Sequence, residues 1–364
     1  MFNSNSQPLA PGRRTVEMSE TSISGPTSRR TRPGTVLLGK DQPFDQFTDL
    51  AVLDDERMLV AGGGSFISSL RGVHVRRWPD LQVESSLPVA GDRFDLRVPW
   101  LLVSGPLWHG QRQSAVALDL ASGRVRAEYP LRSPFLLTDG GFIAGTREHY
   151  AWETHPAVDP ALLPPWPELA ALIDTARPLL VSCTWEGRVR WSLDVASFAP
   201  AFPVLKALAR TPEGDAFFVA TERSLAEVEF ATGHVRWHQG WNDATPVPFL
   251  AHAAVACDPD RVAVGGFSDG QVAPLRVLDR ATHSPLFAGG ASDGSAIECL
   301  AFHGRTLLAG TRSGLLLLFD EAFTRREVRL GRTSVNQLCA IRGGVLAACH
   351  QRELRFLPLL DDET

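Results

Sequence analysis

Apolar and polar residues alternate along most of the chain, and one sequence motif, which we call the phrase, recurs six times. In each copy an alternating run ends at an acidic residue, a short turn follows, and the next apolar run begins. Period-two alternation is typical of a strand with one buried face, and a carboxylate can accept backbone N–H bonds in a turn. The phrase therefore predicts a β-hairpin, with Gly123 and Gly233 in the left-handed conformation that closes a short turn. The acids of the six copies are Asp80, Asp119, Asp194, Glu229, Asp279 and Asp320.

A second pattern, a short apolar run that ends in small residues, precedes most copies of the phrase. Its clearest examples are 58–62, 101–105, 217–221, 262–266 and 307–311. A continuous apolar run with small residues suits a strand that is buried on both faces in a crowded inner layer. Each unit therefore predicts a strand, a buried strand and a hairpin that leads into a last strand, which together make one four-stranded blade.

The spacing of the acids sets the size of the unit. Successive acids are 39, 75, 35, 50 and 41 residues apart, and all but one of these steps are near the roughly 40–45 residues of a propeller blade. The last unit, 334–360, has sequence for only three strands, and 35–38 can supply the fourth from the other end of the chain. We therefore predict an all-β protein, a single β-propeller. Its ring is closed by an N-terminal strand that completes the C-terminal blade, because closure removes exposed sheet edges.

The long step of 75 residues contains a stretch that breaks the repeat. Residues 149–177 hold five prolines, followed by the apolar-periodic run Glu168–Ile173. Prolines exclude a buried strand here, and a proline at the first helical position is a common helix start. The stretch therefore predicts an irregular insertion with a short amphipathic helix that begins near Pro167.

The remaining length fixes the number of blades. Residues 1–34 hold few large apolar groups and are expected to be a disordered tail, ahead of a propeller domain over 35–364. Setting aside the tail and the insertion leaves 301 residues, or 43 for each of seven blades. Seven blades are therefore predicted. Eight blades stay open, because both 142–146 and 179–183 have the pattern of an inner strand.

Parts of the repeat resemble known propeller families. The segment 264–272, which leads to 277–279, resembles a WD-repeat blade, and so does 73–80 with its tryptophan. The phrases that end at 121–123 and 231–237 look like blades of quinoprotein-type propellers. The chain departs from the WD-repeat family in lacking the Gly-His start and the repeated Trp-Asp ending. The resemblance covers about 47–360 as a pattern, and it implies a seven-bladed interaction platform without catalytic residues.

Composition and charge narrow the class of function. No apolar run approaches the roughly 20 residues that span a bilayer, so no membrane association is expected. The net charge of −5 argues against a dedicated nucleic-acid binder, and association with nucleic acid through arginine-rich surfaces is a third, weaker alternative. Five cysteines without CxxC spacing favour buried free thiols, and no secretory signal follows the start, so we expect a cytoplasmic protein. Lysine occurs only at Lys40 and Lys206, an arginine bias that we attribute to bacterial-type composition.

Candidate reactive groups do not form a convincing site. The triplet Gly62–Gly64 lacks the helix and the lysine of a phosphate loop. His149, Glu153 and His155 are spaced so that the three cannot share one face of a helix or strand as metal ligands. We therefore predict no catalytic residues, no metal and no cofactor.

The predicted function is a non-catalytic scaffold or adaptor that binds other protein subunits in a multiprotein assembly. An aromatic residue on a projecting loop is a typical binding hot spot, so the insertion is the predicted contact surface. Its contact residues are Trp152, Trp166, Leu169 and Leu172. Alternatively, the two tryptophans pack the insertion onto the propeller. The alternative function is a propeller enzyme, a lyase or a hydrolase, with its site at the central channel.

Overall fold

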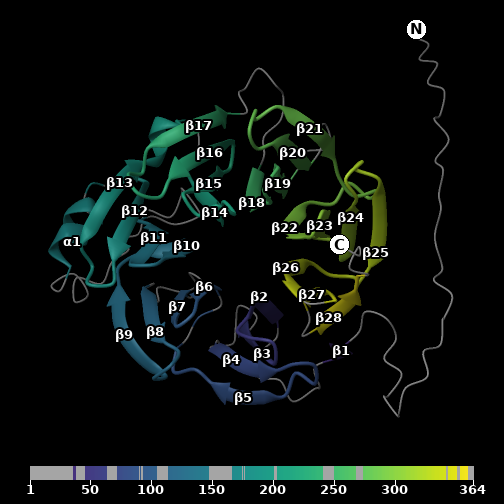
Figure 1. The fold of residues 1–364 in the computed structure, drawn as a ribbon, viewed down its shortest axis with the longest axis horizontal. Helices are drawn as coiled ribbons and strands as arrows, with labels where there is room; N and C mark the ends of the chain where they lie inside the picture. Colours follow the sequence, from purple (N-terminus) through teal and green to yellow (C-terminus); the bar gives the residue numbers. More distant parts are fainter. Residues whose placement is uncertain are drawn as a thin grey trace, which may run out of the picture. The chain divides into compact units, whose positions relative to one another are not determined.

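Seven four-stranded antiparallel sheets form the blades of a β-propeller within residues 33–364, which make one compact unit (Figure 1). The predicted all-β fold and the count of seven blades are confirmed. The predicted tail, 1–34, lies outside the described residues. The computed structural model describes residues 36–37, 46–63, 72–89, 91, 93–104, 114–146, 166–173, 175, 177–200, 203–240, 250–267, 274–341, 343–350 and 353–359.

The first three blades follow one another along the chain, and each pairs its strands in chain order. Blade 1 consists of β2 (Gln46–Val52), β3 (Arg57–Gly63), β4 (Gly72–Arg77) and β5 (Val83–Ser86). Blade 2 consists of β6 (Arg93–Arg97), β7 (Trp100–Ser104), β8 (Ala115–Asp119) and β9 (Arg124–Tyr129). Blade 3 consists of β10 (Arg132–Thr138), β11 (Gly141–Gly145), β12 (Leu179–Thr184) and β13 (Val189–Asp194), with helix α1 (Pro167–Ile173) between β11 and β12.

Blades 4 to 6 repeat the same order. Blade 4 consists of β14 (Leu205–Arg210), β15 (Ala216–Thr221), β16 (Ser224–Glu229) and β17 (Val235–Gly240). Blade 5 consists of β18 (Leu250–Cys257), β19 (Arg261–Phe267), β20 (Leu275–Asp279) and β21 (Pro285–Gly289). Blade 6 consists of β22 (Ile297–His303), β23 (Thr306–Thr311), β24 (Leu315–Phe319) and β25 (Arg325–Arg329).

Blade 7 is built from both ends of the propeller. Its first three strands are β26 (Val335–Ile341), β27 (Gly344–Cys349) and β28 (Glu353–Pro358), and its fourth is β1 (Val36–Leu37). Strand β1 pairs antiparallel with β28, with Val36 opposite Leu354. The predicted closure of the ring by an N-terminal strand is therefore confirmed.

The first strands of the blades line the centre of the ring, and the second strands lie in the core behind them (Figure 1). Each first strand contacts the first strands of both neighbouring blades. The small residues that end the second strands have a steric role. At Gly310 in β23 a Cβ atom would lie 2.7 Å from Cγ1 of Val335 in blade 7, and at Gly265 in β19 it would overlap Ile297 in blade 6. Small residues therefore allow the next blade to approach.

The hairpin between the third and fourth strands closes with one left-handed residue in each of blades 1 to 6. Asp119 accepts hydrogen bonds from the amides of Ala121 and Ser122 at 3.0 and 3.4 Å, as the sequence predicts for the acid of the phrase. The predicted left-handed glycines Gly123 and Gly233 have φ of 65° and 72°. The full set of left-handed turn residues is Leu81, Gly123, Gly187, Gly233, His283 and Phe323.

One copy of the sequence phrase is placed differently from the others. Asp194 ends the fourth strand of blade 3 and caps the 3-10 helix Val195–Ser197, where its side chain accepts from the Ala196 amide. The equivalent turn of blade 3 is Thr184–Gly187, in which the Gly187 amide donates to the Thr184 carbonyl. The assignment of Asp194 to a third-to-fourth-strand turn is therefore wrong, and this shift contributes to the long step of 75 residues.

The two inner-strand patterns that left eight blades open belong to one blade. Strands β11 and β12 pair directly, with Phe142 opposite Cys183. The insertion therefore lies inside blade 3, between its second and third strands.

Candidate functional site

The insertion of blade 3 supplies the residues that the sequence predicts as a contact surface. Its described part includes Trp166 and helix α1, and Trp152 lies outside the described residues. The helix begins at Pro167, where the sequence predicts a helix start. Proline suits this position, because its fixed φ is helical and its missing N–H is not needed in the first turn.

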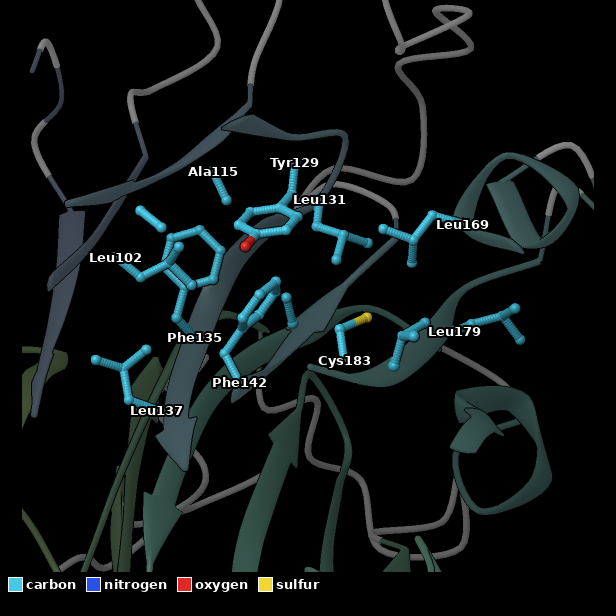
Figure 2. Packing of buried hydrophobic residues seen from close by; sticks show 13 residues of the cluster. Leu102, Ala115, Tyr129, Leu131, Phe135, Leu137, Phe142, Leu169, Leu179 and Cys183 are labelled. Carbon is cyan, nitrogen blue, oxygen red and sulfur yellow. The ribbon is translucent and has the colours of Figure 1, made fainter. Parts of the chain in front are cut away.

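Helix α1 is packed onto the propeller by its apolar side chains. Leu169 is fully buried in a cluster that includes Tyr129 of β9, Phe142 of β11 and Cys183 of β12 (Figure 2). Leu172 is partly buried against the same cluster. Full burial of a leucine side chain contributes about 2 kcal/mol. In this structure Leu169 is therefore a core residue and is not exposed to a partner.

Trp166 is held by ring packing and by a hydrogen bond. Its ring centroid lies 4.9 Å from that of Tyr129, and its Nε1–H donates to the carbonyl of Glu128 at 2.8 Å. A Cβ atom at Gly187, whose φ is 75°, would overlap the indole ring. Trp166 therefore packs the insertion onto blades 2 and 3, as in the alternative interpretation of the sequence.

In blades 3 to 5, a residue of the fourth strand fills the place equivalent to that of Trp166. In blades 1 to 5 the pairing of the third and fourth strands contains a β-bulge at the same position. A bulge re-aims the side chains that follow it, so the next residue is structurally equivalent in all five blades. In order, the residues after the bulge are Ser85, Ala127, Trp191, Trp237 and Phe287.

Each aromatic residue after the bulge covers the left-handed turn residue of the next blade. The pairs are Trp191 with Gly233, Trp237 with His283, and Phe287 with Phe323. The Trp237 and His283 ring centroids are 4.0 Å apart. We call this place a junction socket: it lies between the residue after the bulge of one blade and the left-handed turn residue of the next. At junction 2/3 the residue after the bulge is Ala127, and Trp166 fills the socket over Gly187 instead.

The central channel is the second candidate site, because polar residues recur on the first strands. The pairing of the first and second strands has a register shift at equivalent positions in blades 1, 4, 6 and 7. The residues at these shifts are Thr48, Lys206, Glu298 and Asn336. Lys206 forms an ion pair of 2.9 Å with Glu222, and Glu298 lies 3.7 Å from Arg312. Burial lowers the pKa of Lys206 and raises the pKa of Glu298.

Two carboxylates join the first strands of blades 7, 1, 2 and 3. Asp49 accepts from the Phe94 amide of blade 2 at 2.9 Å and from the Gln337 side chain of blade 7 at 2.9 Å. Asp95 accepts from the Leu137 amide of blade 3 at 2.5 Å. Burial raises the pKa of Asp49, and it raises the pKa of Asp95 to about 6. These hydrogen bonds give both carboxylates a role in holding neighbouring blades together.

The chemistry that the described residues offer is limited. Among them, no group of three or more His, Cys, Asp or Glu side chains is arranged to hold a metal ion. The five cysteines are free thiols. Burial raises the pKa of Cys183, Cys257 and Cys349 to about 12, so these thiols are poor nucleophiles at neutral pH. Within the described part of the chain, no helix is long and apolar enough to cross a membrane.

Sequence reasoning missed both the inner polar residues and the sockets. The signal for the sockets is a short repeat, a valine or proline two residues before the socket position. It occurs as Val83-Glu84-Ser85, Val125-Arg126-Ala127, Val189-Arg190-Trp191, Val235-Arg236-Trp237 and Pro285-Leu286-Phe287. Aligning these triplets would have shown that the aromatic residue is missing from blades 1 and 2.

Comparison with known proteins supports the fold. No family model matches the chain, and no curated protein matches its sequence. The chain is similar to one in the crystal structure of the Mitotic Checkpoint Complex, with a TM-score of 0.61 and 12% identity, over 97% of this chain and 100% of that one. It is also similar to the computationally designed Ika8 protein, with a TM-score of 0.55 and 12% identity, over 86% of this chain and 83% of that one. At such identity the likeness shows the propeller fold alone, and the WD-repeat and quinoprotein resemblances stay predictions.

Proposed function

We propose that the protein is a non-catalytic scaffold that binds other proteins, as a subunit or adaptor of a cytoplasmic assembly. The observation that carries this proposal is the insertion of blade 3, which a propeller blade does not need. Between the second and third strands, blade 4 has only Glu222–Arg223 and blade 6 only Arg312–Gly314, whereas blade 3 has 146–178. Long connections on a rigid scaffold are where binding residues concentrate.

Two further observations support a protein partner. A chain of similar fold is part of the Mitotic Checkpoint Complex, which is by name an assembly of proteins. The net charge of −5 favours protein partners over nucleic acid, whose phosphates attract basic surfaces. Both observations concern the class of partner and leave its identity to experiment.

The carboxylates of the channel support a structural role over a catalytic one. Both oxygens of Asp49 accept hydrogen bonds, one from the Phe94 amide and the other from the Leu50 amide and the Gln337 side chain. A general base needs a free lone pair that is directed at substrate, and three of the roughly four acceptor sites of this carboxylate are used within the ring.

The second candidate function is an enzyme with its site in the central channel. The ion pairs Lys206–Glu222 and Glu298–Arg312 favour it, because they place charged groups on or next to the first strands. Elemental analysis of the purified full-length chain tests one form of this alternative. A stoichiometric metal ion would support the enzyme and count against the scaffold, whereas a metal-free chain would leave the scaffold as the better proposal.

The scaffold is tested by cross-linking the tagged full-length chain in its native cell and identifying the products by mass spectrometry. We expect one or more partners that reconstitute a complex with the purified chain at defined stoichiometry. A chain that stays monomeric with every recovered candidate would contradict the proposal.

The predicted contact surface requires a separate test at Trp152. Deleting the insertion is unsuitable, because it removes Leu169 from the core and Trp166 from its packing on blades 2 and 3. Trp152→Ala should weaken the reconstituted complex at least about tenfold, as truncation of an interface tryptophan commonly does. Leu286→Ala is the matched control, because Leu286 is an exposed apolar residue on the outer strand of blade 5. Equal affinity for both variants would remove Trp152 from the interface.

A further inference from the structure

The junction between blades 1 and 2 has a socket without the ring that the next four junctions possess. The residue after the bulge of blade 1 is Ser85, which is exposed, and the left-handed turn residue of blade 2 is Gly123. No described atom lies within 4 Å of the place that a Cβ atom would take at Gly123. At Gly187 and Gly233, the equivalent place is blocked by a tryptophan ring.

An exposed valine marks the same gap. Val125 of β9 is 47% exposed, and it is one of six large apolar residues with exposed side chains in the described chain. Val125 is equivalent to Val189 and Val235, which pack into the clusters that contain Trp166 and Trp191. Val125 therefore lies on the side of blade 2 where a ring would contact it.

A carbonyl group that can accept a hydrogen bond from an indole N–H is also present at this junction. In blade 4 the carbonyl of Phe230 accepts from Trp191 Nε1–H at 2.9 Å. Leu120 holds the equivalent position in blade 2, because the amides of Leu120 and Phe230 donate to Pro99 and Asp215 in matching turns. An indole in the empty socket would thus have the Leu120 carbonyl as its acceptor.

We propose that the socket of junction 1/2 binds a tryptophan side chain of a partner protein, flanked by an acidic residue. The aromatic residue is inferred from the rings at junctions 2/3 to 5/6, and Trp166 shows that a residue from outside the blade strands can fill such a socket. The acid is inferred from Arg124, which follows Gly123. Its exposed guanidinium has no ion pair or hydrogen bond within the described part of the chain. This proposal rests on the scaffold function and names one surface for it.

The first experiment fills the socket from within the full-length chain. Ser85→Trp should raise the Tm by about 3 °C, because the new ring is placed as Trp191 is, with apolar burial but some loss of rotamer freedom. Glu84→Trp is the matched control, since Glu84 is the exposed bulge residue beside it, and should not raise the Tm. Ala127→Trp should lower the Tm, because Trp166 already fills its socket. A Ser85→Trp variant that is no more stable than Glu84→Trp would overturn the proposal.

The second experiment measures binding by calorimetry with two probes, N-acetyl-L-tryptophanamide and the blocked dipeptide N-acetyl-aspartyl-tryptophanamide. We expect both to bind the wild-type and Glu84→Trp chains, and neither to bind Ser85→Trp. Arg124→Ala should weaken the dipeptide up to about fivefold, the range of an exposed ion pair, and leave the other probe unchanged. Absence of binding to the wild-type chain, or equal binding to Ser85→Trp, would overturn the proposal.

A third variant tests whether the socket is occupied by a tryptophan of a partner or by a tryptophan of the chain itself. Trp108 belongs to the connection between β7 and β8, which corresponds in blade 2 to the insertion that carries Trp166. If Trp108→Ala lowers the Tm, and Ser85→Trp stabilises only in that background, the occupant is Trp108 and the partner is excluded. If the cross-linked complex survives Ser85→Trp unchanged, this socket is not its docking site and the scaffold function still stands.

Discussion

Junctions 2/3 and 1/2 of the ring lack the same aromatic residue and differ in what stands in its place. At junction 2/3, where blade 2 has Ala127, Trp166 covers Gly187 and helix α1 follows it into the core. At junction 1/2, where blade 1 has Ser85, the space over Gly123 is open among the described residues. Equivalent positions of a repeat can therefore be filled by another part of the chain at one junction and stand open at the next.

The largest difference between the two junctions is expected at their turn glycines. Gly187→Ala places a Cβ atom into the Trp166 ring and strains a left-handed backbone, so we expect a loss of about 4 kcal/mol in the free energy of unfolding. Gly123→Ala has only the backbone strain, which costs about 1 kcal/mol. Urea denaturation of both variants measures the difference. Equal losses would show that the space over Gly123 is filled.

The next comparison tests whether Trp166 is equivalent to a tryptophan of the blade strands. Trp166→Ala removes a partly buried ring that packs on Tyr129, and should cost about 2–3 kcal/mol, at or below the lower end of the range for a core tryptophan. Trp191→Ala, at junction 3/4, should cost a similar amount. If Trp166→Ala loses less than about 1 kcal/mol in urea denaturation, the insertion is not anchored through this residue.

The carboxylate between blades 2 and 3 should make stability depend on pH. Burial raises the pKa of Asp95 to about 6, above its unfolded value of 3.8, so the folded chain binds the proton more tightly. Stability therefore increases as the pH falls through about 6, by about 1–2 kcal/mol between pH 7.5 and 5. Asp119, whose pKa Arg126 lowers to about 2, acts only below pH 3.8 and in the opposite direction.

Asp95→Asn is the control for this titration. Asparagine keeps an oxygen acceptor for the Leu137 amide but does not titrate. The gain in unfolding free energy between pH 7.5 and 5 should therefore shrink in the variant. What is left is due to Asp49 and Glu298, whose pKa values burial also raises, and to His74, whose pKa burial lowers and which acts in the opposite direction. An unchanged gain would show that Asp95 does not contribute to the pH dependence.

The smallest effect is expected at the edge of helix α1. Glu168 accepts a hydrogen bond from the Val189 amide at 2.8 Å, which ties the helix to β13. Glu168→Ala should cost about 0.5–1 kcal/mol, the usual net value of one hydrogen bond. Glu84→Ala, an exposed position at the other junction, should be neutral. Thermal denaturation of both variants measures the difference. If Glu168→Ala is as neutral as Glu84→Ala, the apolar contacts alone hold the helix.

The repeat made much of the fold predictable from sequence. Alternation, small-residue endings and the spacing of the acids depend on local chemistry, so they gave seven blades, and the missing last strand gave the ring closure. The helix start was also local, because Pro167 and Glu168 are terminus signals by themselves. The role of Asp194 was misassigned, because the same alternation precedes a turn in one blade and ends a fourth strand in another.

The candidate sites were less predictable, because they depend on residues far apart in the sequence. Ala127 and Trp166 carry no mark of their relation until the ring places them at one junction. Asp49 and Asp95 look like ordinary charges on half-exposed strands, and only the neighbouring first strands supply the amides and the burial that define their role. The helix that contains Leu169 has the same apolar periodicity whether its apolar face packs against a partner or against the propeller.

The two-residue strand β1 also determines when the molecule can be completed during synthesis. Val36 leaves the ribosome 318 residues before its partner Leu354. Pairing at such sequence separation is slow, because the intervening chain must be ordered before the contact forms. Six blades can therefore pack while β1, the outer strand of the seventh, still has no strand to pair with. A nascent or truncated chain that stops before Glu353 has no β28 for β1 to pair with, and unpaired strand edges make such a chain prone to aggregation.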